Sequence, residues 1–464
     1  MSRPSRYLLL FVLAVVCLSC GCGGVGSTPT PTNNTFPVVV FSDIHFNPFD
    51  DSTLCPALNA ADVSTWAAIF EGSKKTPLLP AWKSDTNYPL LVLALAGIKQ
   101  NLGKSPVIIF TGDLLGHTFS TFFSADCSDP NAADMQAFAN KTAIFVMQQV
   151  RASVGNIPVM FAVGNSDSYT GLGPDSVFLA NTVQPYYTNF VNGTLADYPE
   201  FFNTFTSGGY YSAQPLGTKL LVISLNTNPL APPYPGLQSN PTAVYAELAW
   251  LDTTLASAQT AGQKVWVLMH IPPGADTVGT ATTAANFDGT GKLITATMMW
   301  MPAYQESFLQ ILAKYPGVIT LTLAAHTHRD EFRIMSPSDA LDITPSISPF
   351  FGNNPAFKIF TVNKNTFTPT DYRSLNYDLA TPPAQFSDYY TFSEAYSVQG
   401  ALDASFATLY PELVTNSSKQ ALYIGQYNSG HNTLNPITPA NWPIFACGIG
   451  KMAEQDLIDC VHSY

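Results

Sequence analysis

Five apolar runs of the sequence each end in side chains that can bind a metal ion. The runs and their closing residues are Val38–His45 with Asp43 and His45, Val107–Asp113 with Asp113, Val159–Asn165 with Asn165, Val265–His270 with His270, and Ile319–His328 with His326 and His328. Four of the seven histidines of the chain stand at these ends. Apolar runs of this kind are typical of buried β-strands. The sequence therefore predicts strands that deliver metal ligands.

Asp43 and His45 show how such a strand could hold an ion. Side chains two residues apart in an extended segment point to the same side, so both can bind one cation. Aspartate, asparagine and histidine donors suit Zn, Mn or Fe, whereas a Cys-based structural zinc site would need thiolates. We therefore expect divalent ions, with Zn as the first choice and Mn or Fe as alternatives.

This order of motifs resembles the calcineurin-like metallophosphoesterase superfamily, and the resemblance extends from Phe36 to Asp371. It implies two metal ions, with Asp113 bridging both. The first ion would be bound by Asp43, His45, Asp113 and His328, and the second by Asp113, Asn165, His270 and His326. The resemblance also implies an α/β sandwich of four layers, in which two mixed β-sheets are flanked by helices.

Further stretches resemble the branch of acid sphingomyelinase and the sphingomyelinase-like phosphodiesterases. They are Gly112–His117, Leu221–Asn228, Ile343–Pro349, Asn353–Lys358 and the pair Cys447 and Cys460. His117 matches a second active-site histidine of this branch. The family motif Gly-Asn-His-Asp/Glu appears here with Ser166 in place of the histidine. We assign catalytic roles to His117, Asp113 and Asn165, and substrate contacts to His117 and Ser166.

The expected reaction follows from this set of ligands. Two ions can polarise a phosphoryl oxygen and hold a bridging hydroxide for in-line attack on phosphorus. The sequence has neither a Gly-x-Ser-x-Gly elbow nor a Walker loop. We expect a phosphodiesterase that acts on sphingomyelin-like lipids or other phosphoesters. The alternatives are a nucleotide phosphohydrolase or phosphomonoesterase of the same branch, and a catalytically weakened phosphoester-binding protein, because Ser166 lacks an imidazole.

The N-terminal segment predicts export. Arg3 and Arg6 precede a short apolar core, which is typical of a secretory signal. We expect a signal peptide over residues 1–22, with plain cleavage or lipidation at Cys20 or Cys22 as alternatives, and a flexible tether over residues 23–35. The lipoprotein-like start favours a bacterial protein that is periplasmic, secreted or lipid-anchored.

Four cysteines lie beyond the signal region, an even number that fits an oxidising compartment. Three connectivities are possible from the sequence. The resemblance favours a disulfide between Cys447 and Cys460, and we accordingly pair Cys55 with Cys127.

The overall composition describes an acidic protein with few charges. Only 11% of the residues are charged, and the net charge is −12. An acidic composition of this kind does not provide the excess of basic residues that is typical of nucleic-acid-binding proteins. We expect a monomer that acts on a small-molecule or lipid phosphoester and could contact a membrane through a lipid anchor or a lipid substrate.

Helical periodicity separates the apolar runs. Ala133–Ser153, Pro241–Ala261 and Ala303–Tyr315 are predicted helices, and each precedes a motif strand. Alternating strands and helices indicate an α/β fold. We expect a catalytic domain over residues 36–371 and a small helical subdomain over residues 372–464. The long excursion Phe46–Asn101 is expected to be a loop region that packs through its aromatic residues, and the alternative is that part of it walls the substrate cleft.

Overall fold

The structure is a computed structural model that describes residues 34–464 except 76–77, 128–131, 195–197, 233–239, 433 and 435. The predicted signal peptide, with Cys20 and Cys22, lies outside this part, as does the predicted tether apart from Asn34 and Thr35. The chain from Thr35 onward forms one compact unit. No helix of the described part is long and apolar enough to cross a bilayer.

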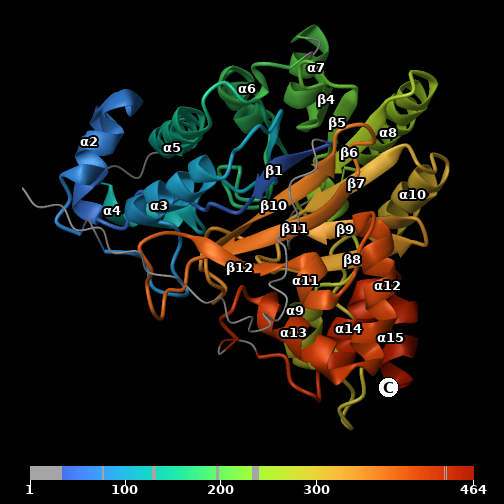
Figure 1. Cartoon of the computed structure of the whole chain (residues 1–464). Helices are drawn as coiled ribbons and strands as arrows, with labels where there is room; N and C mark the ends of the chain where they lie inside the picture. Colours follow the sequence, from blue (N-terminus) through green and yellow to red (C-terminus); the bar gives the residue numbers. More distant parts are fainter. Residues whose placement is uncertain are drawn as a thin grey trace, which may run out of the picture. The chain divides into compact units, whose positions relative to one another are not determined.

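Two six-stranded sheets form the framework (Figure 1). The first sheet has the order β12-β11-β10-β1-β2-β3, and the second has the order β4-β5-β6-β7-β9-β8. The first contains β1 (Thr35–Phe41), β2 (Ile108–Phe110), β3 (Val159–Phe161), β10 (Ala356–Asn363), β11 (Pro369–Asn376) and β12 (Ser387–Thr391). The second contains β4 (Tyr211–Ala213), β5 (Leu220–Ser224), β6 (Lys264–Leu268), β7 (Ile319–Ala324), β8 (Glu331–Ser336) and β9 (Asp339–Ile343).

Both sheets are mixed, as predicted. In the first sheet β1, β2 and β3 run parallel, while β10 runs antiparallel to β1. In the second sheet β5, β6 and β7 run parallel, while β4 runs antiparallel to β5. Parallel neighbours end at the same edge of a sheet, so the residues that follow β1, β2 and β3 are brought together, as are those that follow β6 and β7.

Helices flank both sheets and confirm the three predicted helical segments. These segments form α5 (Ala132–Val154), α8 (Pro241–Thr260) and α10 (Pro302–Ala313). Other helices are α1 (Cys55–Ala60), α2 (Trp66–Glu71), α3 (Tyr88–Gln100), α4 (Phe119–Asp126), α6 (Ser176–Tyr186), α7 (Tyr198–Gly208) and α9 (Thr277–Thr282). In Figure 1, α8 and α10 lie on the side of β5–β7, whereas α3 and α5 lie on the side of the first sheet.

Alternating side chains of β6 show how the layers pack. Trp266 and Leu268 are buried in a core that also contains Val39 of the first sheet. Val265 and Val267 are buried in a second core against helices α8 and α10. Because successive side chains of a strand point to opposite faces, one strand serves both cores. The sequence of a central strand that is buried on both faces is therefore a continuous run of apolar residues.

The C-terminal region differs from the expected helical subdomain at its start. The expected boundary after Asp371 falls inside β11, which pairs with β10 and β12 within the first sheet. The helical part begins only at Phe392 and comprises α11 (Phe392–Tyr396), α12 (Leu402–Thr415), α13 (Ser417–Tyr427), α14 (Trp442–Gly450) and α15 (Glu454–His462). The aromatic residues Tyr389 and Tyr390 belong to the edge strand β12 rather than to a helix.

The structure pairs the four cysteines beyond the signal region as expected. Cys55 is joined to Cys127, with 5.4 Å between their Cα atoms, and Cys447 is joined to Cys460, with 5.9 Å. The first disulfide links α1 to the residue that follows α4. The second links α14 to α15.

Candidate active site

The predicted metal ligands lie in the loops that follow the strands. Asp43 and His45 come after the end of β1 at Phe41, and their φ angles are +49° and +44°. The expectation that both stand on an extended segment is therefore wrong. Their backbone N–H groups donate to the carbonyls of Gly112 and Asp113, which pins this loop to the loop after β2. The two side chains converge through this left-handed turn.

Positive φ angles recur at the other predicted ligands. Asp113, His326 and His328 have φ angles of +66°, +72° and +62°. Non-glycine residues with such angles cost free energy and cluster at functional sites, where the surrounding structure enforces them. The loops therefore hold a preset arrangement of side chains.

Asp113 lies at the centre of the cluster. Its Oδ2 atom is 3.2 Å from Nε2 of His45 and 3.1 Å from Nε2 of His270. Its Oδ1 atom accepts a hydrogen bond of 2.7 Å from the backbone N–H of Ser166. A Cβ at Gly164 would stand only 2.0 Å from that Oδ1 atom, which explains the glycine before Asn165. One carboxylate thus faces two groups of ligands.

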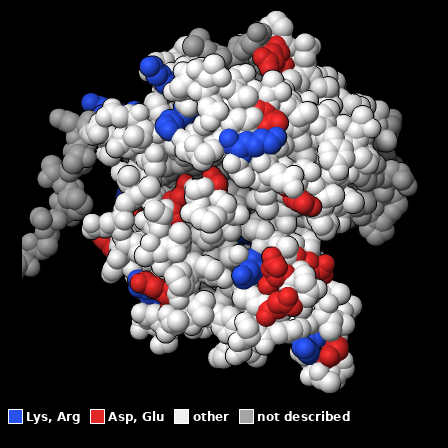
Figure 2. Space-filling model, turned by 90° about the vertical axis from the view of Figure 1, so that its right-hand side faces the viewer, with Lys and Arg blue, Asp and Glu red and all other residues white. Residues whose placement is uncertain are grey.

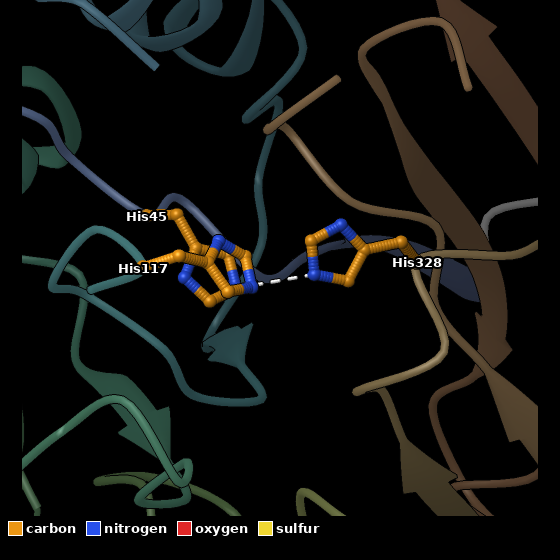
Figure 3. A group of neighbouring side chains, drawn as sticks. All are labelled: His45, His117 and His328. Atoms are coloured by element: carbon orange, nitrogen blue, oxygen red, sulfur yellow. Dashed lines mark hydrogen bonds between the residues drawn. The ribbon is translucent and has the colours of Figure 1, made fainter. Parts of the chain in front are cut away.

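The first group surrounds Asp43, His45 and His328. The Oδ1 atom of Asp43 is 3.7 Å from His45 Nε2 and 3.4 Å from His328 Nε2. The two imidazole Nε2 atoms face each other at 3.1 Å, as Figure 3 shows. The Nδ1 atom of His45 is 3.0 Å from the carbonyl oxygen of Leu115 and must donate to it. The Nε2 lone pair of neutral His45 therefore points at His328 and Asp113.

The second group surrounds His270. Asp113, His270 and His326 each offer a ligand atom, and these atoms lie within 4.8 Å of one another. The Oδ1 atom of Asn165 is 3.3 Å from His270 Nε2. The Nδ1 atom of His270 lies 2.7 Å from the carbonyl oxygen of Thr111 and donates to it, which again leaves Nε2 as the free donor atom. The structure thus brings all seven predicted ligands together.

The chemistry of this cluster fits two cations. Both carboxylate oxygens of Asp43 are fully buried and accept no hydrogen bond from the described residues. Such a charge is costly unless an ion or a donor compensates it. The Nε2 atoms of His45 and His270 lie 3.2 and 3.1 Å from Asp113 Oδ2, so lone pairs on these atoms would repel one another unless a proton or a cation lies between them.

The pKa values show how protons compensate this crowding. Burial opposes ionisation of Asp113, but the neighbouring His270 and His45 outweigh burial and hold its pKa well below the usual range. Burial lowers the pKa of His270, whereas the stronger combined effect of Asp113, Asp43 and the Thr111 carbonyl raises it to about 9. Burial and the neighbouring His270 lower the pKa of His326 to about 4. A positive charge close to Asp113, carried by a proton or by a metal ion, is therefore strongly stabilised.

His117 lies beside the first group and is held by a carboxylate. Its Nδ1 atom is 2.8 Å from Oδ1 of Asp85, and its backbone N–H donates to Oδ2 of the same residue at 2.7 Å. Ser348 also donates to Oδ1 of Asp85. The imidazole is stacked between the rings of His45 and Phe350, with centroids 3.9 Å away on each side. Figure 3 shows the stacking of His117 on His45.

Asp85 lies in the excursion Phe46–Asn101 and was missed as a site residue. None of the described residues of this excursion lines the cavity over the site, so its alternative role as a cleft wall is not confirmed. We expect Asp85→Asn to lower turnover by about 10–100-fold, the usual effect of removing the partner that orients an active-site histidine. The loss should be larger for an alkyl leaving group than for p-nitrophenolate, because only the former needs a proton. Asp62→Asn, on the exposed surface of the same excursion, is the control. Equal losses for both leaving groups would show that Asp85 has only a structural role.

Asp167 is a second residue with a supporting role that the sequence did not reveal. Its carboxylate accepts hydrogen bonds from the backbone N–H groups of Asp113, Leu114 and Gly164, at 3.0, 2.8 and 2.8 Å. Burial and the nearby Asp113 raise its pKa to about 6. Asp167 therefore fixes the loops after β2 and β3 relative to each other. The sequence signal for this residue was its place as the acidic residue of the Gly-Asn-x-Asp pattern, Gly164–Asp167.

A cavity of about 500 Å³ opens over the cluster. Its lining includes the site residues His117, Asn165, Ser166, His326 and His328. The rest of the lining includes three threonines, a glycine and a tyrosine as well as apolar and charged side chains. The apolar ones are Leu172, Val278, Met299, Phe350 and Phe351, and the charged ones are Asp113, Asp276, Arg329 and Glu331. The cavity can therefore accept a ligand that has both apolar and polar parts.

Comparisons with known proteins agree with this arrangement. Residues 36–330 match the calcineurin-like phosphoesterase family. Sphingomyelin phosphodiesterase B of Dictyostelium discoideum is 25% identical over 470 residues, which are 94% of this chain and 66% of that protein. The chain thus spans just under two thirds of the length of this relative. The cyclic GMP-AMP phosphodiesterase SMPDL3A of Mus musculus is 24% identical over 82% of each chain.

Among solved structures, a dimetal phosphatase from Danio rerio covers 77% of this chain and 99% of its own, with a TM-score of 0.42 and 9% identity. The relatives of sphingomyelin phosphodiesterase type confirm the resemblance to that branch. The match over residues 36–330 includes every predicted metal ligand. The chain therefore belongs to the calcineurin-like phosphoesterase family.

Proposed function

We propose that the protein is a phosphodiesterase that uses two divalent metal ions. Asp43, His45, Asp113 and His328 would hold one ion, and Asp113, Asn165, His270 and His326 would hold the other. The observation that carries this proposal is the central Asp113 carboxylate, which stands within 3.2 Å of imidazole nitrogens from both groups. The nitrogen and oxygen donors favour Zn, with Mn or Fe as alternatives.

Residues around the two ions would then have separate roles in the reaction. Two bound ions would polarise phosphoryl oxygens and supply hydroxide at neutral pH. Asp85 holds the Nδ1 side of His117, so that its Nε2 side can carry a proton for the leaving oxygen. The side chains of Asn165 and Ser166 reach the same cavity and can orient the phosphoryl group. Phe350 stacks on one face of the His117 ring, with 3.9 Å between the ring centroids, and so fixes the plane of the imidazole.

The substrate class we propose is a phosphodiester with an apolar part, such as a sphingomyelin-like lipid. The sphingomyelin phosphodiesterase among the relatives and the apolar lining of the cavity support this substrate class. Leu172 and Phe351, two lining residues, remain 39% and 40% exposed, so an apolar group could lie along them. A nucleotide phosphohydrolase or phosphomonoesterase is the alternative, because one relative is a cyclic GMP-AMP phosphodiesterase.

Export and the monomeric state belong to the same proposal. Two disulfides support an oxidising location, periplasmic, secreted or lipid-anchored. Figure 2 shows one face on which charged side chains of both signs are scattered among a majority of uncharged residues. The uncharged majority of that face is compatible with contact to a lipid surface through an anchor or a lipid substrate.

The direct test is hydrolysis of bis(p-nitrophenyl) phosphate by protein whose metal content is known. The proposal predicts turnover that a chelator removes and that Zn or Mn restores. Protein with two bound ions that hydrolyses neither this ester nor sphingomyelin would contradict it. That outcome would favour the second candidate, a phosphoester-binding protein with weakened catalysis.

The second candidate function rests on Ser166, which occupies the position of the histidine in the family motif. Its hydroxyl oxygen accepts a hydrogen bond of 3.3 Å from Asn165 Nδ2, and a serine cannot supply the proton that an imidazolium can. We expect Ser166→His to raise turnover of an alkyl phosphodiester, because a general acid contributes about 10²–10⁴-fold. Turnover of bis(p-nitrophenyl) phosphate should change less. Ser166→Ala serves as the control, and an equal change in both variants would mean that the imidazole adds nothing.

A further inference from the structure

The turn that follows α13 connects the C-terminal helical region to the active site. This turn, Tyr427–His431, lies beyond residues 36–330, the part of the chain that matches the phosphoesterase family. Tyr427 nevertheless lines the cavity over the site. Its carbonyl oxygen accepts the backbone N–H of Asp330 at 3.0 Å, two residues after His328. The turn therefore holds the backbone of a loop that carries a predicted metal ligand.

The same turn holds the segment Pro349–Asn354, which brings two phenylalanines to the cavity. The carbonyl oxygen of Asn428 accepts the backbone N–H of Asn354 at 3.2 Å. Both residues are buried, which shields this hydrogen bond from water. The Nδ1 atom of His431 lies 2.5 Å from the carbonyl oxygen of Gly352 and must donate to it. These two hydrogen bonds anchor the C-terminal half of the segment.

The imidazole of His431 also stacks on a tryptophan of the excursion Phe46–Asn101. The centroids of the His431 and Trp82 rings are 3.8 Å apart, and the angle between the ring planes is 5°. The next residue, Lys83, donates its backbone N–H to the carbonyl oxygen of Pro349 at 3.1 Å. Because stacked aromatic rings stabilise the elements that carry them, this stack joins the turn to the excursion.

Both supports of the His117 ring are connected to this stack. Asp85, whose Oδ1 atom is 2.8 Å from Nδ1 of His117, comes three residues after Trp82. Phe350, whose ring centroid is 3.9 Å from that of His117, comes two residues before Gly352. The stack and the hydrogen bond to Gly352 therefore fix the two segments that hold the imidazole relative to each other.

We propose that His431 is a positioning residue, which keeps the His117 ring in the orientation that the reaction requires. The inference rests on the proposed function, and it gives the C-terminal helical region a role at the site. His431 does not line the cavity, so it would act only through its contacts with Trp82 and Gly352. A displaced His117 would reach the leaving oxygen poorly, because proton transfer requires a donor within hydrogen-bond distance.

Three substitutions separate the two contacts of His431. His431→Phe keeps a ring for Trp82 but has no N–H for the Gly352 carbonyl. His431→Asn keeps an N–H donor near the position of Nδ1 but has no ring, and His431→Ala has neither. The readout is kcat for two aryl phosphodiesters that differ in their leaving groups. Diphenyl phosphate has a more basic leaving group than bis(p-nitrophenyl) phosphate and therefore has the greater need of a proton.

We expect kcat for diphenyl phosphate to fall about 10-fold in the Phe and Asn variants and about 100-fold in His431→Ala, since a general acid contributes about 10²–10⁴-fold. For bis(p-nitrophenyl) phosphate, kcat should change little. The metal content should stay at the wild-type value, because His431 is not among the predicted ligands. A purely structural role would not produce this difference between leaving groups.

His462 provides the matched control. It also lies in the C-terminal helical region, its Nε2 atom donates to the carbonyl oxygen of Leu293 at 2.7 Å, and it does not line the cavity. His462→Phe and His462→Asn should leave kcat for both esters unchanged. Thermal unfolding shows which variants are folded, and should His431→Ala fail to fold, the Phe and Asn variants, which keep one contact each, provide the test.

The outcomes separate this inference from the proposed function. Equal losses for the two esters in the folded His431 variants, or an unchanged kcat for diphenyl phosphate, would overturn the positioning role. Wild-type protein that hydrolyses bis(p-nitrophenyl) phosphate but not diphenyl phosphate would lack the proton transfer that His431 is proposed to support. That result would overturn the inference and leave the phosphodiesterase standing. Absence of hydrolysis of both esters would instead remove the proposed function itself.

Discussion

Replacing Asp113 by asparagine is expected to abolish measurable hydrolysis. The Oδ2 atom of Asp113 stands 3.2 Å from His45 Nε2 and 3.1 Å from His270 Nε2, so one substitution removes the charge shared by both groups. Metal polarisation contributes several kcal/mol to transition-state stabilisation, and about 1.4 kcal/mol is a factor of ten. We therefore expect a loss of about 10³-fold or more in kcat/KM for bis(p-nitrophenyl) phosphate.

The fold should survive this change. The remaining Oδ1 atom of an asparagine can still accept the backbone N–H of Ser166, which holds the loop after β3. Circular dichroism and the unfolding midpoint should thus stay near those of the wild type, while the metal content falls. Asp175→Asn, at the exposed N-terminus of α6, is the control and should keep its activity. Full activity in Asp113→Asn would contradict the bridging role.

Lys358→Met is expected to cause the largest loss of stability. Lys358 lies on β10 of the first sheet, and its Nζ atom is 2.7 Å from Asp330 Oδ1 and 2.8 Å from Asp342 Oδ2. Asp342 belongs to β9 of the second sheet, so this buried group joins the two sheets. Removal of the cation leaves two carboxylates unpaired in the core. Breaking a buried ion pair in this way costs about 3–5 kcal/mol of the free energy of unfolding.

The loss should depend on pH in a defined direction. Burial, more than the opposing charge of Lys358, sets the pKa of Asp342 and raises it to about 7. A raised pKa means that the folded state binds more protons, so the stability contribution of this carboxyl is present at low pH and disappears as the pH rises through about 7. Without Lys358 this pKa should rise further. The deficit of Lys358→Met should therefore be larger at pH 8 than at pH 5.

Urea unfolding at both pH values measures this deficit. Lys314→Met is a suitable control, because Lys314 is exposed and its ion pair with Asp252, although 2.8 Å long, is at the surface. Surface pairs of this kind contribute about 0–1 kcal/mol. Similar losses for the two lysines would show that the buried ion group does not join the sheets.

The strands and the convergence of their ends could be predicted from the sequence, because central strands that are buried on both faces read as apolar runs. Val265–Leu268 is such a run, and its alternate side chains enter two different cores. The backbone of the ligand loops could not be predicted. Asp43 and His45 meet through a left-handed turn, and nothing in their residue types requires positive φ angles.

Supporting residues were also beyond the sequence, because they act through contacts that are distant in the chain. Asp85 meets His117 across 32 positions, and Ser348 reaches Asp85 across 263. At the C-terminus, β12 is an edge strand whose tyrosines are partly exposed, so it lacks the buried apolar run that marks the central strands.

The most direct test of the paired-cation site is the number of divalent ions bound per chain. Protein purified with its cations preserved can be analysed by inductively coupled plasma mass spectrometry against an accurate protein concentration. We predict about two ions per chain for the wild type, with Zn as the first choice. A content of one ion or none, in protein that remains folded and has been dialysed against Zn, would contradict the account.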